Sequence, residues 1–226
     1  MSDEYKASGV LFSGGLDSAV LVADALQSGP VIPVYVSVGL AWEAEERAMA
    51  ARLFARAPFA GSVAPLTELS FDMRDVYAAD HWAVLGRAPS FDTPDEDVYL
   101  EGRNTILLAK SAVFFARRRV NRILMGQLAG NPFPDATPEF IAAMSKALSL
   151  GLGLPIAIET PLATLHKADV IRRGVELGVP LELTMSCMEP RGGLHCGRCS
   201  KCRERRDAFA DAGVTDPTAY REKPIR

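Results

Sequence analysis

Short apolar runs alternate with longer stretches of mixed polarity along the chain. Residues 10–12 form a brief apolar run, and residues 31–39, VIPVYVSVG, are rich in β-branched side chains, which favours buried strands at both places. Residues 19–26 and 42–56 instead carry apolar side chains at helical spacing. The pattern therefore predicts strand, helix, strand and helix in that order.

The same alternation continues towards the C-terminal end. A third strand is expected near residues 64–69, followed by a polar loop that contains Pro89 and Pro94. Strands that alternate with helices predict an α/β fold, with a Rossmann-like parallel sheet and helices on both of its faces. The further elements are expected as helices at residues 104–119, 138–148 and 166–178 and strands at residues 122–127 and 156–162.

Length and composition are those of one globular domain spanning residues 1–226. Hydrophobic residues make up 48% of the chain and charged residues 23%, which suits a sizeable core. The net charge of −3 gives no general attraction to nucleic acid, and no apolar run approaches the roughly 20 residues of a membrane span. The N-terminal MSDEYKASG lacks the basic start and apolar stretch of a secretory signal. We therefore expect a cytoplasmic protein with reduced cysteines.

Residues 13–18, SGGLDS, connect the first predicted strand to the first predicted helix. In parallel α/β folds this loop is the usual phosphate site, because backbone N–H groups and the helix dipole favour an anion there. Gly14 and Gly15 let phosphate oxygens approach the backbone, and the hydroxyls of Ser13 and Ser18 can donate hydrogen bonds. The segment matches neither GxxxxGK[ST] nor GxGxxG. The alternative interpretation is a tight turn that caps the helix.

Asp17 does not suit a site for a bare anion. Its carboxylate either faces a Mg²⁺ ion that bridges phosphates or holds the loop through hydrogen bonds to the backbone. After a strand, SGGLDS resembles the pyrophosphate loop (PP-loop) of the N-type ATP pyrophosphatases, which include asparagine, GMP and NAD synthetases and tRNA thiolases. The resemblance implies an adenine nucleotide alpha hydrolase-like fold and attack of a substrate oxygen on the α-phosphate of ATP. It assigns ATP binding to Ser13, Gly14, Gly15, Leu16, Asp17 and Ser18.

The cysteines form one cluster, Cys187, Cys196, Cys199 and Cys202. Their C-x8-C-x2-C-x2-C spacing suits tetrahedral zinc, and a structural site uses all four thiolates. An iron–sulfur cluster is the alternative, since it also uses C-x2-C-x2-C. Zinc is favoured because the fourth cysteine lies upstream and no Cys-Pro follows. We expect one structural zinc ion per chain, in a zinc knuckle of about residues 187–210.

Together, the PP-loop and the cysteine cluster resemble the 7-cyano-7-deazaguanine synthase family. The resemblance covers nearly the whole chain and implies an ATP-dependent ligase of queuosine precursor biosynthesis. That family converts the carboxylate of 7-carboxy-7-deazaguanine to a nitrile (preQ0) with ATP and ammonia, through an acyl-adenylate and an amide. GNPFPDAT (130–137) departs from the family's Gly-Tyr-Pro-Asp-Cys-Arg, which concerns substrate recognition. The strings that agree, in order, are EGRN (101–104), PDATPEF (134–140), TPL (160–162) and HKADVIRRG (166–174).

Four residues outside the PP-loop are candidates for the active site. Arg103 precedes a predicted helix, where a guanidinium can bind phosphate or a carboxylate bidentately. The resemblance assigns Lys167 to the triphosphate; the alternative is a solvated lysine in the first turn of a helix. Asn104 is either a substrate contact or a helix N-cap, and Asp135 either accepts the donors of a guanine-like edge or is a turn residue. The candidate catalytic residues are Asp17, Arg103 and Lys167.

Three alternatives or additions stay open at this stage. A related PP-loop ligase would adenylate another carboxylate or an RNA base, although thiolation is disfavoured because all cysteines are assigned to metal. A non-catalytic zinc-knuckle protein that binds nucleic acid is disfavoured by the acidic balance of the chain. Trp42 and Trp82 either lie near the substrate or pack in the core. The expected partners are thus a small-molecule carboxylate, ATP with magnesium, and ammonia, without nucleic acid or membrane, in a monomer or homodimer.

Overall fold

A parallel sheet forms the centre of the protein, for which the computed structural model describes residues 7–222. Within these residues, five strands pair in the order β3-β2-β1-β4-β5. All four pairings are parallel, as the alternation of strands and helices predicted. The strands are β1 Ser8–Leu11, β2 Val31–Ser37, β3 Thr67–Ser70, β4 Arg122–Leu124 and β5 Ala157–Glu159.

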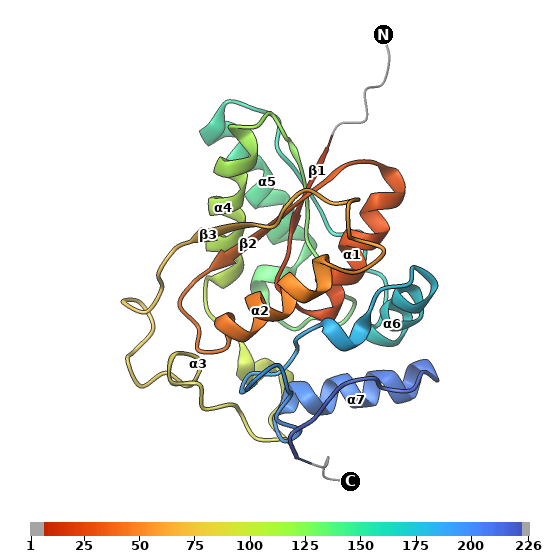
Figure 1. The fold of residues 1–226 in the computed structure, drawn as a ribbon. Helices are drawn as coiled ribbons and strands as arrows, with labels where there is room; N and C mark the ends of the chain where they lie inside the picture. The colour runs from red at the N-terminus through yellow and green to blue at the C-terminus, as the bar shows by residue number, and fades with distance from the viewer. Residues whose placement is uncertain (1–6, 223–226) are drawn as a thin grey trace.

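Helices cover both faces of this sheet (Figure 1). One face carries α1, α2 and α6, whose buried side chains share a core with the centre of the sheet, and α7 packs on α6. The other face carries α4 and α5, which form a second core with the strands. The main helices are α1 Leu16–Ala25, α2 Glu43–Phe54, α4 Arg103–Ala116, α5 Pro138–Leu152, α6 Lys167–Glu176 and α7 Ser200–Ala212.

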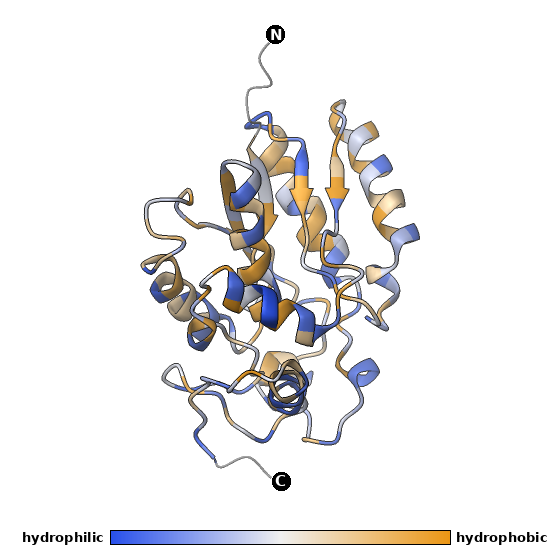
Figure 2. Cartoon of the chain, turned by 90° about the vertical axis from the view of Figure 1, so that its right-hand side faces the viewer, coloured by the Kyte–Doolittle hydropathy of each residue, from blue (hydrophilic) through white to orange (hydrophobic). Residues whose placement is uncertain are grey.

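The hydrophobic residues that predicted these elements lie on the strands and on the inward faces of the helices (Figure 2). Gly9 shows how closely the layers pack, because a Cβ atom there would lie 2.5 Å from the ring of Phe115 on α4. A side chain at position 9 would therefore require the ring of Phe115 to move. No helix within residues 7–222 is long and apolar enough to cross a membrane.

The long connection between β3 and α4 differs from the polar loop that the sequence predicted. It contains the short helix α3 Trp82–Leu85 and packs its own small core, in which Trp42 and Trp82 stack with ring centroids 5.7 Å apart. Both indoles therefore pack in a core, which is one of the two alternatives of the sequence analysis. Trp42 also lines the cavity described below, so a position near the substrate stays a prediction for this residue. Short 3₁₀ turns complete the fold at Leu26–Ser28, Asp95–Val98, Pro134–Ala136 and Leu181–Leu183.

In the strand order, β1 lies between β2 and β4. The chain therefore adds β2 and β3 on one side of β1 and adds β4 and β5 on the other side. The connections that follow β1 and β4 thus separate at the carboxyl edge of the sheet. In open α/β sheets, ligands bind in the crevice formed at this point. The PP-loop, residues 13–18, begins directly after β1 and therefore lies at the crevice.

Candidate active site

The PP-loop turns sharply between β1 and α1, and Gly14 makes the turn. Gly14 has φ +78°, a backbone conformation that L-residues with a side chain rarely adopt. A Cβ atom at this position would also lie 3.2 Å from Cβ of Glu46 on α2. Gly15 then occupies the N-cap position of α1 without a side-chain cap. The first N–H groups of α1 consequently remain available to an anion.

Hydrogen bonds between the two serines fix the shape of the loop. The Ser13 amide donates to Ser18 Oγ at 3.2 Å, and Ser18 Oγ donates to the Gly15 carbonyl at 2.9 Å. The two hydroxyl oxygens are 3.2 Å apart. Both serines hold the loop together in this state, and their donation to phosphate stays a prediction.

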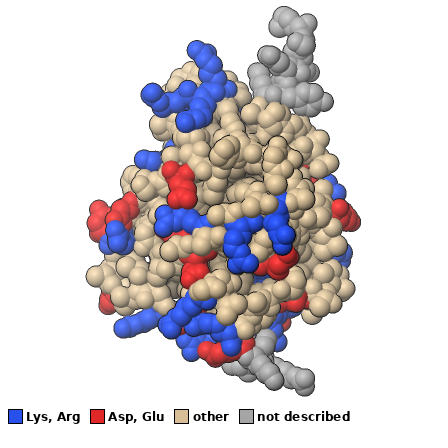
Figure 3. Space-filling model, in the orientation of Figure 1, with Lys and Arg blue, Asp and Glu red and all other residues tan. Residues whose placement is uncertain are grey.

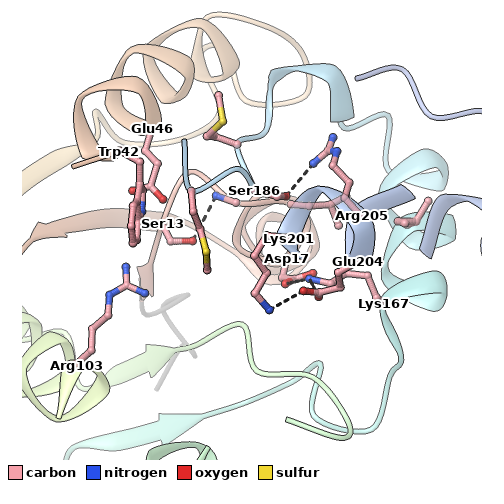
Figure 4. Close-up of a pocket in the computed structure, with 15 residues that line it drawn as sticks. Ser13, Asp17, Trp42, Glu46, Arg103, Lys167, Ser186, Lys201, Glu204 and Arg205 are labelled. Carbon is pink, nitrogen blue, oxygen red and sulfur yellow. Dashed lines mark hydrogen bonds and ion pairs between the residues drawn. The ribbon is translucent and has the colours of Figure 1, made fainter. Parts of the chain in front are cut away.

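A cavity of about 250 Å³ opens beside the loop (Figure 4). Ser13, Gly15, Leu16 and Asp17 line it, together with the side chains of Arg103 on α4 and Lys167 on α6. A second cavity of about 220 Å³ shares Ser13, Gly15, Asp17 and Arg103 and also contacts β2. The structure thus brings the three candidate catalytic residues, Asp17, Arg103 and Lys167, to one place at the carboxyl edge of the sheet.

Lys167 forms ion pairs with two carboxylates. Its Nζ atom lies 2.6 Å from Asp17 Oδ2 and 3.3 Å from Glu204 Oε1 on α7. Burial by itself lowers the pKa of Lys167, but the two carboxylates outweigh burial and raise this pKa above its ordinary value. The ammonium group therefore stays charged across the physiological pH range. The alternative that Lys167 is a solvated lysine in the first turn of a helix is therefore wrong, because its side chain is only 25% exposed.

Asp17 has the capacity to bind a cation in addition to Lys167. Its Oδ1 atom is buried and has no hydrogen-bond partner. Burying a carboxylate oxygen without a partner costs free energy. Such an oxygen is a suitable ligand for a hard cation such as Mg²⁺. Asp17 thus fits the metal-facing alternative of the sequence analysis better than a purely structural role in the loop.

Arg103 is the first residue of α4, and its Nε atom is buried without a partner. An unpaired guanidinium N–H at the wall of a cavity can bind a phosphate or carboxylate oxygen. The prediction that Asn104 caps this helix is wrong, because Gly102, with φ +72°, occupies the N-cap position. The glycine lets the chain enter the helix one residue earlier than the sequence pattern indicated.

Asn104 and Asp135 contact each other. The Asn104 amide N–H donates to Asp135 Oδ2, and Asn104 Nδ2 donates to Asp135 Oδ1, both at 3.1 Å. Asp135 lies in the 3₁₀ turn Pro134–Ala136 and is buried, which raises the pKa of its carboxyl group. Since both carboxylate oxygens already accept hydrogen bonds, the contacts favour the turn role of Asp135. Substrate contact by either residue stays a prediction.

The sequence analysis missed four charged residues of the cavity, which are Glu46, Lys201, Glu204 and Arg205. Glu46 lies on α2, and Lys201 and Glu204 lie on the first turns of α7. Lys201 Nζ is 2.6 Å from Glu204 Oε2. The two lysines, 167 and 201, hold the pKa of Glu204 at about 2 against the effect of burial, which raises it. Each residue sits in a strongly charged stretch, EAEER or KCRERR, that is typical of a solvated helix face.

The four cysteine sulfur atoms lie within 4.8 Å of one another and are buried. This cluster can hold a metal ion, as the spacing predicted. His195, next to Cys196, is oriented elsewhere, because its Nε2 atom accepts a hydrogen bond from the Ser186 amide at 3.1 Å. The helix α7 begins directly at the cluster, with Cys199 as its N-cap residue. The cysteine cluster therefore positions the helix that supplies Lys201 and Glu204 to the cavity.

Acidic and basic side chains are interspersed over the face of the molecule in Figure 3. Basic side chains gather at the upper edge of this view and, together with acidic ones, at its lower edge near the C-terminal end of the chain.

Comparison with known proteins gives matches over nearly the whole chain. Residues 8–213 match the family described as queuosine biosynthesis protein QueC. The 7-cyano-7-deazaguanine synthase of Methanoculleus marisnigri is 33% identical over 227 residues, covering 93% of this chain and 96% of the relative. The synthase of Azoarcus sp. is 36% identical over 227 residues, with 95% and 96% covered.

A solved structure with the same fold is that of the U34-tRNA thiolase NcsA from Methanococcus maripaludis, determined with its [4Fe–4S] cluster. It is 9% identical, with a TM-score of 0.50, and the match covers 92% of this chain and 68% of that one. At this identity the likeness concerns the fold alone. Together with the parallel sheet and the cysteine cluster, it confirms the predicted fold class.

Proposed function

The chain belongs to the QueC family of queuosine biosynthesis proteins, and we therefore propose that it is a 7-cyano-7-deazaguanine synthase. Such an enzyme is an ATP-dependent ligase that turns the carboxylate of 7-carboxy-7-deazaguanine into a nitrile. The observation that carries the proposal is the convergence of Ser13, Asp17, Arg103 and Lys167 on one cavity after β1. We also propose that residues 1–226 act as a single catalytic domain.

We assign the triphosphate of ATP to the PP-loop. We propose that the N–H groups at the start of α1 and the hydroxyl of Ser13 donate to phosphate oxygens. The hydroxyl of Ser18 donates to the Gly15 carbonyl, so it must exchange this partner to bind phosphate as well. Lys167 is the nearest cation, and it can exchange one of its two carboxylate partners for a phosphate oxygen. Mg²⁺, when bound at Asp17, would neutralise part of the negative charge of the phosphates.

Adenylation is the first chemical step in this proposal. The substrate carboxylate attacks the α-phosphorus of ATP, the new C–O–P linkage forms, and pyrophosphate leaves. Arg103 and Lys167 lie on opposite sides of the cavity and stabilise the charge that develops on the phosphorus oxygens. Ammonia then displaces AMP to give an amide, and a second adenylation on the amide oxygen leads to the nitrile.

The cysteine cluster is proposed to hold one structural zinc ion. With Zn–S bonds of about 2.3 Å, neighbouring sulfur atoms of a tetrahedral site are about 3.8 Å apart. Cys196 Sγ and Cys199 Sγ lie 3.8 and 3.5 Å from Cys202 Sγ, which fits a single ion. A four-iron cluster would separate the sulfur atoms more widely, because each thiolate binds a different iron. Zinc at this place stabilises the start of α7.

The proposed function is tested with purified protein, ATP, ammonium and 7-carboxy-7-deazaguanine. We expect pyrophosphate release without ammonium only when the carboxylate is present. With ammonium, mass spectrometry should detect the amide first and the nitrile later, together with AMP. The amide, added alone with ATP, should also be converted. Absence of carboxylate-dependent pyrophosphate release, together with no turnover of the amide, would contradict the proposed function.

A further inference from the structure

Glu46 is a buried carboxylate at the wall of the cavity, and nothing in the adenylation step uses it. Its side chain lines the 250 Å³ cavity, and its residue is 7% exposed. Its Cβ and backbone pack directly on Gly14 of the PP-loop. Glu46 therefore has a fixed position beside the phosphate site, at the start of α2 (Figure 4).

Glu46 differs from the other carboxylates that line this cavity. Asp17 and Glu204 are both paired with Lys167. Among the carboxylates that line the cavity in the described residues 7–222, Glu46 alone has no ion pair within 4 Å. A carboxylate without a neighbouring cation keeps its basicity, whereas Lys167 and Lys201 lower the pKa of Glu204.

The groups that face Glu46 come from three elements. The hydroxyl of Tyr35 on β2 donates to Glu46 Oε2 at 2.6 Å, and a hydrogen bond from Trp42 also favours the charged carboxylate. Arg103 on α4 acts at longer range in the same direction, and the carboxylate of Glu43 on α2 acts against it.

Glu43 is not an alternative proton acceptor, although it lies one helical turn from Glu46. It accepts hydrogen bonds from the Ser37 hydroxyl, from the Val38 amide at 2.8 Å and from the Gly39 amide at 3.3 Å. These contacts give Glu43 a structural role at the end of β2. Burial, by contrast, is the largest effect on Glu46 and raises its pKa to about 7, which suits exchange of a proton near neutral pH.

Two cavities meet next to this carboxylate. Glu46 lines the first cavity and its partner Tyr35 lines the second, while Ser13, Asp17 and Arg103 line both. A substrate carbon bound between the cavities therefore lies close to the α-phosphate and close to Glu46. A base is needed at that place only when nitrogen enters and when the nitrile forms.

We propose that Glu46 is the catalytic base of the nitrogen steps, with Tyr35 as the residue that orients it. This assignment rests on the proposed function. In the first nitrogen step, ammonia forms the C–N bond, the C–O bond to AMP breaks, and one N–H proton moves to Glu46. In the nitrile step, the adenylated amide loses two N–H protons, one at a time, as the C≡N bond forms. AMP leaves with the former amide oxygen and its electron pair, and Glu46 returns each proton to solvent.

The Glu46→Gln variant separates this role from ATP chemistry. Glutamine keeps the volume of the side chain and an oxygen that accepts the Tyr35 hydrogen bond, but it takes up no proton. We expect carboxylate-dependent exchange of pyrophosphate into ATP, measured without ammonium, to stay within about 3-fold of the wild type. Formation of amide and of nitrile should fall by about 100-fold or more, the usual contribution of a general base.

Rescue by another nucleophile gives a second readout. Hydroxylamine is a weaker base than ammonia and is mostly uncharged at neutral pH, so it needs less help from a base. We expect Glu46→Gln to form the hydroxamate from the acyl-adenylate at close to the wild-type rate. Tyr35→Phe removes a donor that lowers the pKa of Glu46, so the acidic limb of the pH profile of amide formation should move to higher pH.

Glu68→Gln is the matched control, because Glu68 lies on β3 away from the cavity in an exposed pair with Arg47. It should leave exchange and nitrile formation unchanged. Equal losses of exchange and amide formation in Glu46→Gln, or a raised KM with unchanged kcat, would instead make Glu46 a binding or structural residue and overturn the assignment. If the wild type itself shows no carboxylate-dependent exchange, the proposed function fails, and the base role falls with it.

Discussion

Lys167 Nζ and Asp17 Oδ2 lie 2.6 Å apart, although 150 residues separate them along the chain. The contact joins the PP-loop to the start of α6 and, through Glu204, to α7. Their side chains are only 25% and 23% exposed, so the cost of removing both charges from water offsets much of their attraction, and the pair adds little net stability. The role of this ion pair is to place a carboxylate and a cation where the phosphates of ATP are expected to bind.

Replacement of Asp17 by Asn or of Ser13 by Ala should therefore impair ATP chemistry more than folding. We expect carboxylate-dependent exchange of pyrophosphate into ATP to fall by about 100-fold for Asp17→Asn. The melting temperature should change by only a few degrees. Glu176→Gln, which removes an exposed partner of Arg173, serves as the control and should change neither quantity. Parallel losses of exchange and melting temperature would show that Asp17 and Ser13 are structural.

Replacement of Gly14 by Ala should destabilise the protein for two separate reasons. The left-handed backbone costs an alanine about 1–2 kcal/mol, and the new Cβ atom would lie 3.2 Å from Cβ of Glu46. Gly61→Ala is the matched control, since Gly61 has φ +75° but a Cβ atom there would have no neighbour within 4 Å. Urea unfolding should give a larger loss for Gly14→Ala than for Gly61→Ala. Equal losses would mean that α2 shifts without cost.

The contribution of Glu46 to the stability of the protein should fall between about pH 4.5 and pH 7. Burial raises the pKa of Glu46 from 4.5 to about 7, so in this window the folded state binds a proton that the unfolded chain has released. The stability that the neutral carboxyl gives at low pH is lost as the pH rises. The difference between the two pKa values corresponds to at most about 3 kcal/mol.

Urea unfolding of the wild type and of Glu46→Gln at pH 5 and pH 8 measures this effect. The glutamine variant should gain stability relative to the wild type as the pH is raised. Other titrating groups are common to both proteins and cancel in the comparison. A stability difference that does not change with pH would contradict the raised pKa of Glu46.

Removal of the metal should loosen α7 and disturb the cavity. A structural zinc ion contributes to folding energy, and α7 begins at the cysteine cluster. Hydrogen exchange should accelerate in α7 after chelation and remain slow in α1, which lies in the main core. Elemental analysis of the untreated protein should find one zinc per chain. Iron in the sample with absorbance in the visible range, or unchanged exchange in α7, would contradict the proposal.

The alternation of apolar and mixed segments was sufficient to predict the parallel sheet, and the spacing of Cys196, Cys199 and Cys202 was sufficient to predict a metal-binding cluster. Both depend on local sequence. Helix boundaries were less exact, because they depend on single backbone conformations. The start of α4 is an example, since it depends on the positive φ of Gly102.

The charged residues of the cavity could not be predicted in the same way. Glu46 and Glu204 lie in the first turns of helices that begin with closely spaced charged residues, so their spacing does not indicate which of them are buried. Their burial depends on distant partners, Tyr35 for Glu46 and Lys167 for Glu204. Contacts of this kind arise only when the sheet brings separate segments together.

The cavity takes its walls from both ends of the chain, from Ser13 on the PP-loop to Arg205 on α7. During synthesis on the ribosome, the β strands are complete once residue 159 has emerged, long before Glu204 and Lys201 are available to close the site. An N-terminal fragment that ends before α7 therefore contains the five strands and the PP-loop but lacks the charged residues Lys201, Glu204 and Arg205 of the cavity wall. The cavity is therefore complete only after α7 has been synthesised, and a chain that stops before α7 lacks part of the proposed active site.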